Sequence, residues 1–363
     1  MGDFFEIDFL QVESNKSGDA ITIRYQLNGQ TTIHVVDGGF QDTGDSIISH
    51  ISQYYDNATY IDRVILTHPD GDHAGGLQKV LRHFSVGELW MIRPWIYSNE
   101  LIHRFSKYTS VENLEKRLKE IYPNVAALED IAIEKKIKMY EPFQGARIGE
   151  FTVLSPTKEF YLDMVVESEK TPESVKSEEK SASFSLSTAT EKFAKRILTF
   201  IRSLWGEERF STEETSSENE MSIIQYSRLN DKNILLTGDA GRKSLELAIQ
   251  YAPFAGLVLP GIDRFQIPHH GSRRNLSTEL LDNLLGPRLR EKRQPGQELF
   301  TSIASASQKD EDHPRKAVIR AMIHRGGKAI TNETANLRTS ANAPHRDGWS
   351  TAIPLEYPEE QEE

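Results

Sequence analysis

The stretch from Val64 to Gly76, VILTHPDGDHAGG, decides how the rest of the chain is arranged. Residues 63–67 have the composition of a buried strand, and after a turn a helix is expected to begin near Ala74. Four side chains of the turn carry nitrogen or oxygen donors: His68, Asp70, Asp72 and His73. Imidazoles and carboxylates crowded in this way favour a cation between them, and the donor set suits zinc, manganese or iron. The alternative is a polar turn whose histidines bind no metal.

The run HPDGDH resembles the second motif of the metallo-β-lactamase fold, usually written HxHxDH, with Asp70 in place of the second histidine. Followed by Ala-Gly-Gly, this HxDxDH form is similar to the soluble hydrolase domain of competence-type DNA-uptake channel proteins (ComEC-like) and to certain phosphodiesterases of the superfamily. The resemblance covers roughly residues 4–156 and 218–340. It implies an α/β (α+β) fold, a four-layer αβ/βα sandwich with the site at one edge between two sheets.

Two further carboxylates occur in motifs of this superfamily. Asp37 lies in DGG after the expected strand 32–36 and resembles the first motif. We expect it to orient the metal-site loops through hydrogen bonds rather than to bind metal, although an ordinary Asp-Gly turn is the alternative. Asp239, in ILLTGD at a strand end, resembles the fourth motif, in which the carboxylate can bridge two cations.

The histidine pair in QIPHHGS resembles the fifth motif. His270 is expected to complete a metal position with Asp72, His73 and Asp239, while His269 faces the substrate. The opposite assignment of the two histidines and a buried pair without a ligand are the alternatives. Asp72 would both bind metal and orient the attacking water.

Three more polar residues are candidates for contacts with substrate or loops. Asn219 and Ser222, in NEMS before a strand, resemble the ComEC-like branch, in which the Asn replaces the third-motif histidine of the wider superfamily. Because an amide is a poorer metal ligand than neutral imidazole, we interpret them as residues that orient loops or contact substrate. His313, in a His-Pro pair that also resembles the ComEC-like pattern, is a candidate phosphate contact or proton donor.

Basic residues follow the histidine pair. Arg273 and Arg274 come directly after it, and a denser basic run, residues 288–293, comes later in the chain. We expect this basic cluster to lie beside the site, where it would attract a phosphate backbone locally. The alternative is a solvated surface.

Composition divides the chain into four parts. Residues 1–156 and 218–357 would form the two halves of the metallo-β-lactamase-like domain, and residues 358–363 an acidic, disordered tail. Residues 157–217 are rich in Ser, Glu, Lys and Thr, which predicts a largely mobile insertion. One island within it, Thr190 to Trp205, has helical spacing and would cap the site, dock a partner or pack on the core.

Hydrophobic spacing predicts the order of the elements. The predicted strands are 4–12, 21–27, 32–36, 63–67, 88–92, 147–154, 223–226, 233–236, 257–259, 299–304 and 350–357. The predicted helices are 44–55, 77–84, 99–122, 125–136, 242–251 and 315–325. The helix 99–122 is highly charged, which indicates a solvated face or a surface for a protein partner.

The bulk composition narrows the class of protein. The net charge of −11 gives no general attraction for nucleic acid, so only a local basic patch would bind it. The absence of cysteine excludes disulfides and thiolate metal sites and is consistent with a cytoplasmic location. The acidic N-terminal stretch is unlike a signal peptide, and no run of about 18 apolar residues predicts a membrane span.

These observations lead to three hypotheses. The first is a hydrolase with one or two zinc or manganese ions that cleaves a phosphodiester, with DNA as the leading substrate. The second is a phosphodiesterase or esterase for small molecules. The third is an effector subunit, for example in a defence system, that is active only with a protein partner bound through residues 157–217 or helix 99–122.

Overall fold

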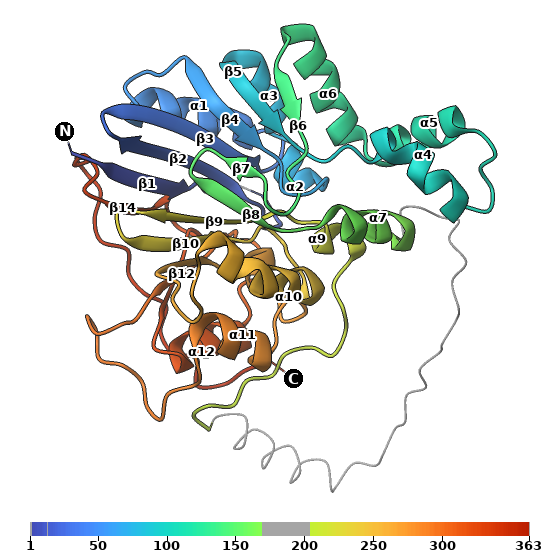
Figure 1. Cartoon of the computed structure of the whole chain (residues 1–363). Helices are drawn as coiled ribbons and strands as arrows, with labels where there is room; N and C mark the ends of the chain where they lie inside the picture. The colour runs from blue at the N-terminus through green and yellow to red at the C-terminus, as the bar shows by residue number, and fades with distance from the viewer. Residues whose placement is uncertain (1, 13, 169–203, 363) are drawn as a thin grey trace, which may run out of the picture.

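The computed structural model describes residues 2–12, 14–168 and 204–362. Within these ranges, two sheets face each other and helices cover the outer face of each sheet (Figure 1). The predicted four-layer αβ/βα sandwich is therefore confirmed. The helical island 190–205 lies almost wholly outside the described residues.

The first sheet has seven described strands in the order β14-β1-β2-β3-β4-β5-β6. Neighbours from β14 to β3 are antiparallel, and neighbours from β3 to β6 are parallel. The strands are β1 (Phe4–Phe9), β2 (Ala20–Leu27), β3 (Gln30–Gly38), β4 (Tyr60–Ile65), β5 (Ser85–Trp90), β6 (Lys138–Tyr140) and β14 (Leu337–Ala341).

The second sheet repeats this arrangement. Its described order is β13-β12-β11-β10-β9-β8-β7, antiparallel from β7 to β10 and parallel from β10 to β13. The strands are β7 (Arg147–Ile148), β8 (Phe151–Ser155), β9 (Ile224–Leu229), β10 (Lys232–Leu236), β11 (Arg264–Gln266), β12 (Thr301–Ala304) and β13 (Lys328–Thr331). The two sheets thus have the same strand pattern, a symmetry that the sequence does not display.

The helices connect the parallel strands and border the site. The α-helices are α1 (Thr43–Tyr54), α2 (Gly71–Ala74), α3 (Leu77–His83), α4 (Ser98–Leu101), α5 (Val111–Ile121), α6 (Pro123–Lys135), α7 (Lys158–Glu167), α9 (Ser217–Glu220), α10 (Arg242–Tyr251), α11 (Thr278–Leu285) and α12 (Lys316–His324). The 3₁₀ turns are η1 (Pro94–Tyr97), η2 (Ile102–Arg104), η3 (Ala252–Ala255) and η4 (Pro268–Gly271).

Three apolar layers hold these elements together. Ile47 of α1 and Leu77 of α3 belong to the layer outside the first sheet. Leu245 of α10 belongs to the layer outside the second sheet. Ile23 and Leu236 belong to the layer between the sheets. Because the carboxyl ends of parallel strands meet at one edge of a sheet, the loops after β3, β4, β10, β11 and β12 gather at one place.

The predicted helix 99–122 is wrong. The chain forms α4 and η2 and then leaves the helix before α5 begins at Val111. Phe105 takes an extended conformation and is buried in the core, while the Ser110 side chain accepts a hydrogen bond from Asn113 N and caps α5. Burial of the Phe105 ring and the N-cap at Ser110 therefore interrupt the helix, although the hydrophobic spacing of residues 99–122 is continuous.

Other element predictions also differ from the structure. Gly149, with φ +62°, turns the predicted strand 147–154 into the hairpin β7–β8. Residues 257–259 and 350–357 are not strands. The insertion begins with the helix α7, whose Tyr161 and Val165 are buried in the core. No helix in the described ranges is long and apolar enough to cross a membrane.

The acidic tail was also predicted wrongly, as far as Glu362. Gln361 is buried and accepts a hydrogen bond from Arg209 N at 2.9 Å. The Glu362 carboxylate accepts from Lys316 N at 2.6 Å. It therefore caps the first turn of α12, where free N–H groups and the helix dipole favour a negative charge.

Candidate metal centre

The carboxylate of Asp239, in the turn after β10, lies among four imidazole rings. Its Oδ1 is 3.3 Å from His73 Nε2. Its Oδ2 is 3.8, 3.6 and 3.7 Å from the Nε2 atoms of His68, His269 and His270. These separations are longer than ordinary hydrogen bonds. Two donors that bind one tetrahedral cation at about 2.1 Å lie roughly 3.4 Å apart, so the observed spacing matches ligands of a common ion.

Buried polar atoms without hydrogen-bond partners are concentrated in this cluster. They include His68 Nε2, His73 Nε2, Asp239 Oδ1 and both ring nitrogens of His270. A buried donor or acceptor without a partner destabilises a fold, so such a concentration requires an explanation. One donor atom each of Asp72, His73, Asp239 and His270 lies within 4.8 Å of the others. The residues therefore fit a divalent cation with nitrogen and oxygen ligands.

Asp37, at the end of β3, fixes the tautomers of two histidines. His73 Nδ1 donates to Asp37 Oδ2 at 2.7 Å, which leaves a lone pair on His73 Nε2. Thr67 donates to the same carboxylate from N and Oγ1, at 2.8 and 2.6 Å. Since the Thr67 hydroxyl is then an acceptor toward His68 Nδ1 at 3.1 Å, the lone pair of His68 Nε2 also faces the cluster.

Close backbone packing brings β3 and the α2–α3 turn together. A Cβ atom on Gly76 would lie 2.2 Å from the carbonyl oxygen of Gly38 and 2.7 Å from Gly44 N. No side chain fits between these backbone atoms. The Gly75-Gly76 pair therefore lets the turn that carries His73 approach the loop that follows Asp37.

Asp19 and Gln266 link the two halves of the site across the sheets. Gln266 Nε2 donates to Asp19 Oδ2 at 2.9 Å, and Asp19 N donates to Asp72 O at 3.2 Å. Gln266 Oε1 accepts from Thr237 N and Gly238 N, at 2.9 and 3.2 Å, and so holds the turn that carries Asp239. One donor atom each of Asp19, Asp37 and His73 also lies within 4.8 Å of the others. Because His73 Nδ1 already donates to Asp37, we assign this group to support of the centre rather than to metal binding.

His269 lies on the exposed side of the cluster. Its side chain is 27% exposed, against 3% for His270. Asn275 Nδ2 donates to the carbonyl oxygens of Asp239 and Ala240, so its Oδ1 must face His269 Nδ1, at 2.9 Å. His269 Nδ1 is then the donor, and its Nε2 presents a lone pair toward the centre.

His313 stacks on His269 with ring centroids 5.6 Å apart. Its Nδ1 donates to Asp310 Oδ2 at 3.1 Å, and Asp310 also accepts from the hydroxyl of Ser17 at 2.7 Å. Burial lowers the pKa of His313, and the neighbouring His270 and His269 lower it further. A neutral His313 would therefore present the lone pair of Nε2 beside His269.

The other residues predicted for the site lie around the edge of this cluster or support its turns. Asp70 and Asp72 lie on α2 or its N-cap, and their side chains are 27% exposed. The Ser222 hydroxyl accepts from Asp239 N at 3.2 Å, so it supports the Asp239 turn. Asn219 donates from Nδ2 to Thr215 Oγ1 at 2.7 Å, and this nitrogen lies 3.1 Å from His269 Nδ1.

The charges of the cluster shift the pKa values of its members. Burial alone would lower the pKa of His270, but Asp239 and Asp72 raise it to about 9. Burial also opposes protonation of His73, yet Asp239 and Asp37 raise its pKa well above the usual value. Burial disfavours the charge of Asp239, but His73 and His270 hold its pKa well below the usual range. The cluster therefore attracts positive charge, which protons supply when no cation does.

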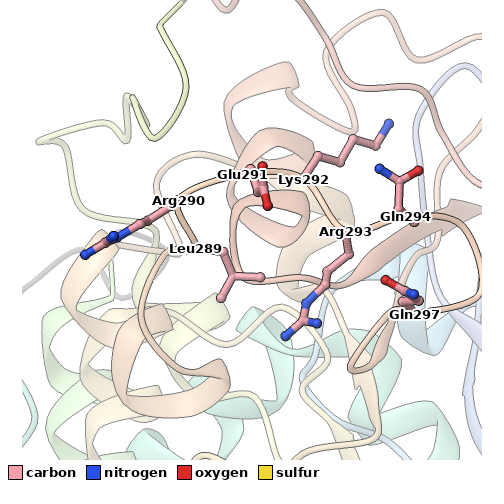
Figure 2. Close-up of a pocket in the computed structure, with 7 residues that line it drawn as sticks. All are labelled: Leu289, Arg290, Glu291, Lys292, Arg293, Gln294 and Gln297. Carbon is pink, nitrogen blue, oxygen red and sulfur yellow. The ribbon is translucent and has the colours of Figure 1, made fainter.

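The basic run 288–293 does not lie beside this centre. Arg315 N, before α12, donates to Gly271 O at 3.0 Å, whereas Leu289 N donates to His324 O at the other end of α12 at 2.7 Å. A helix of nine residues, as α12 is, spans about 13 Å. The run instead borders a surface hollow of 320 Å³, around which Arg290, Lys292 and Arg293 point in different directions (Figure 2).

Several residues of the centre were not among the candidates from sequence. They are Asp19, Thr67, Gln266, Asn275 and Asp310. Each is a single polar residue that supports a ligand-bearing turn or orients an imidazole ring. Two of them could have been found from their place in the sequence. Thr67 directly precedes HPDGDH, and Gln266 is the first residue of QIPHHGS. Asp19 directly precedes β2, outside the motifs considered above.

Comparison with known proteins finds a sequence match over part of the chain and similar solved structures. Residues 19–128 match the sequence model of the metallo-beta-lactamase superfamily. The chain matches no curated protein. Among solved structures it is similar to a Thermotoga maritima protein assigned to the metallo-beta-lactamases (10% identity, TM-score 0.27, 61% of this chain and 68% of that one).

Two further solved structures are similar. CmlA, a diiron β-hydroxylase from Streptomyces venezuelae, shows 13% identity and a TM-score of 0.41, over 94% of this chain and 54% of that one. AbOPH, a hydrolase in the beta lactamase superfamily, shows 12% identity and a TM-score of 0.30, over 68% and 74% of the two chains. The sequence match over residues 19–128 and the two-sheet architecture together show that the chain has the metallo-β-lactamase fold.

Proposed function

We propose that this protein is a metal-dependent hydrolase of phosphodiesters, with DNA as the first candidate substrate. The observation that carries the proposal is the ring of four imidazole Nε2 atoms around Asp239, at 3.3 to 3.8 Å. His73, His270, Asp72 and Asp239 would hold one cation, and His68 and Asp70 would contribute to a second. Bound divalent cations supply Lewis-acid polarisation and lower the pKa of water.

The chain's own residues would position the reactants. Asp72 is partly exposed, so its carboxylate can accept a hydrogen bond from the attacking water and direct it toward phosphorus. The rings of His269 and His313 stack on the open side, with centroids 5.6 Å apart. One can contact a phosphate oxygen, and the other can take or return the proton that moves during cleavage.

The choice of a phosphodiester over a carbonyl substrate rests on the resemblance of HPDGDH to ComEC-like hydrolases and certain phosphodiesterases, and on the His313-Pro314 pair that resembles the ComEC-like pattern. Arg242 and Arg274, near the open side, supply cations of the kind that hold phosphate. Zinc and manganese are the first cations to test. A protein partner for residues 157–217 or 99–122 remains a prediction.

The test combines metal binding with hydrolysis. The purified chain would be titrated with Mn²⁺, Zn²⁺ and Mg²⁺, then incubated with single-stranded DNA, duplex DNA, plasmid and bis(p-nitrophenyl) phosphate. His73→Gln should lose metal binding and hydrolysis, whereas the matched control His345→Gln, 84% exposed, should lose neither. Cleavage of the small diester alone would exclude DNA as the substrate. Metal binding without cleavage of any diester would contradict the proposed reaction.

A further inference from the structure

We infer that Arg242, Lys243 and Arg274 form a phosphate-binding subsite beside the metal centre, and that Glu213 and Glu214 occupy it with their own carboxylates in this structure. The inference rests on the proposed function, because it names the substrate group that the same site would take. It goes further because it assigns Glu213 and Glu214 as residues of the same chain that compete with the substrate phosphate for these cations.

The three cations come from two separate elements and lie close to the centre along the chain. Arg242 and Lys243 begin α10, a few residues after Asp239, and Arg274 follows the turn of His269. Arg242 Nε donates to Arg274 O at 2.9 Å, so the two elements are tied together where the cations emerge. The subsite is thus anchored to both turns that carry candidate ligands.

Two consecutive acidic residues meet all three cations. Glu213 Oε2 lies 2.5 Å from Arg274 Nη2, and Glu214 Oε2 lies 3.0 Å from Lys243 Nζ. Arg242 Nη2 donates to the carbonyl oxygen of Glu213. Each of the three cations therefore has an oxygen acceptor from one short segment, and phosphate oxygens are acceptors for the same donors.

The segment that carries these glutamates runs directly to the open side of the centre. Ser211 N donates to Arg273 O at 3.1 Å. Thr215 Oγ1 accepts from Asn219 Nδ2 at 2.7 Å, and Asn219 in turn lies against His269. The acidic strap, defined as residues 211–215, leads into α9, which lies beside α10 (Figure 1). It therefore borders the side from which a substrate would reach His269.

The ion pairs of the strap are exposed and weak. The paired side chains are 44–69% exposed, and exposed pairs of this kind each change an equilibrium by only a few-fold. A phosphate group can make charge-assisted hydrogen bonds to the same arginine and lysine, and those with two forked oxygens are stronger. The strap can therefore be displaced, but its two negative charges oppose binding of an anion until it moves.

The test measures binding without catalysis. A fluorescein-labelled single-stranded oligonucleotide would be titrated by anisotropy with the full chain in chelator, so that no diester is cleaved. Glu213→Gln with Glu214→Gln should tighten binding by about three- to tenfold, because two exposed pairs and two repulsive charges are removed. Glu359→Gln with Glu360→Gln changes the net charge equally at exposed tail residues and should change binding less than twofold.

Substitution of the cationic side chains tests whether they are the source of the tighter oligonucleotide binding. In the strap-neutral background, Arg274→Ala with Lys243→Ala should cancel the gain, and inorganic pyrophosphate should compete with the oligonucleotide only while these two cations are present. Unchanged affinity in the strap variant, an equal gain in the tail control, or a gain that persists without Arg274 and Lys243 would overturn the inference. The proposed function fails separately, if the metal-loaded wild-type chain cleaves no diester while these binding differences remain.

Discussion

Two buried clusters of charged side chains in this molecule are bonded in different ways. In the first, at β1, guanidinium and carboxylate atoms pair closely: Arg24 Nε lies 2.6 Å from Glu6 Oε1, and Arg346 Nη1 lies 2.7 Å from Asp8 Oδ1. In the second, the carboxylate oxygens of Asp239 lie 3.3 to 3.8 Å from four imidazole nitrogens, and no guanidinium or ammonium group pairs with Asp239 among the described residues.

This difference in spacing indicates that the two clusters have different roles. The β1 cluster contains its own cations, and the rings of Tyr54 and Trp349 pack on Arg346 with centroids 4.6 and 4.8 Å from Cζ. It joins the first strand to the segment after β14, so we assign it to stability. The Asp239 cluster has the carboxylates and imidazoles of an ion-binding site at the spacing that an added cation requires.

The largest expected effect comes from Asp239→Asn, which keeps the shape of the side chain and removes its charge. Metal-dependent hydrolysis should fall at least about 10³-fold, or roughly 4 kcal/mol in the barrier, because the Asp239 carboxylate faces all four imidazoles. Steady-state kinetics with bis(p-nitrophenyl) phosphate measures this change. Asp347→Asn, fully exposed, is the control and should keep full activity. Unchanged turnover in Asp239→Asn would mean that the cluster is not the reactive centre.

The next effect concerns stability. Asp8→Ala leaves Arg346 buried with one fewer counter-charge, so the free energy of unfolding in urea should fall by about 3–5 kcal/mol. Metal affinity should not change, because Asp8 contacts no member of the Asp239 cluster. The control Asp56→Asn keeps a residue that tolerates the left-handed backbone at this position, removes the charge of an exposed partner of Arg24, and should cost less than about 0.5 kcal/mol. A fall in metal affinity of Asp8→Ala would show that the two clusters are coupled.

A smaller effect is expected from the link between the two halves of the centre. Asp19→Ala removes the acceptor of Gln266 Nε2 and should weaken Mn²⁺ binding by about 10–100-fold in calorimetric titrations. Asp19→Asn keeps an oxygen that can accept this bond and should recover most of the affinity. Equal losses in both variants would mean that the charge of Asp19, rather than its link to Gln266, matters.

The first half of the centre was largely predictable from sequence because it is local. His68, Asp70, Asp72 and His73 follow one strand in one turn, and the apolar run before them identifies the strand. The second half needed the resemblance, since Asp239 and the histidine pair come from separate turns. Asp37, which orients His73, was expected from its motif, whereas Thr67, Asn275 and Asp310, which orient the other imidazoles, were not.

The reason is distance along the chain. The bond from Ser17 to Asp310, which in turn holds His313, joins residues 293 apart. Local hydrophobic spacing contains no information about such pairs. β14 was not predicted for the same reason. Its sequence, LRTSA, alternates only weakly between apolar and polar residues, and it forms a strand by pairing with the edge of β1. Tertiary pairing, not local propensity, determines these features.

The smallest expected effect is a pH dependence that distinguishes the two clusters. In the metal-free protein the pKa of His270 is raised to about 9, against about 6.5 in an unfolded chain. The stabilisation from its bound proton is therefore complete below the lower pKa and is lost as pH rises through the higher one. For this one proton, the free energy of unfolding should fall by at most about 1.4 kcal/mol per pH unit.

The β1 cluster should not contribute to this fall. Arg346 and His50 hold the pKa of Asp8 below its usual range despite burial, so its stabilisation is lost only in acid. Saturating metal should abolish the fall above neutral pH, because a metal ligand such as His270 must already be deprotonated. Urea unfolding at several pH values, with chelator and with Mn²⁺, measures both curves. Parallel curves with and without metal would mean that the ion does not replace the proton on His270, and that the two clusters differ only in geometry.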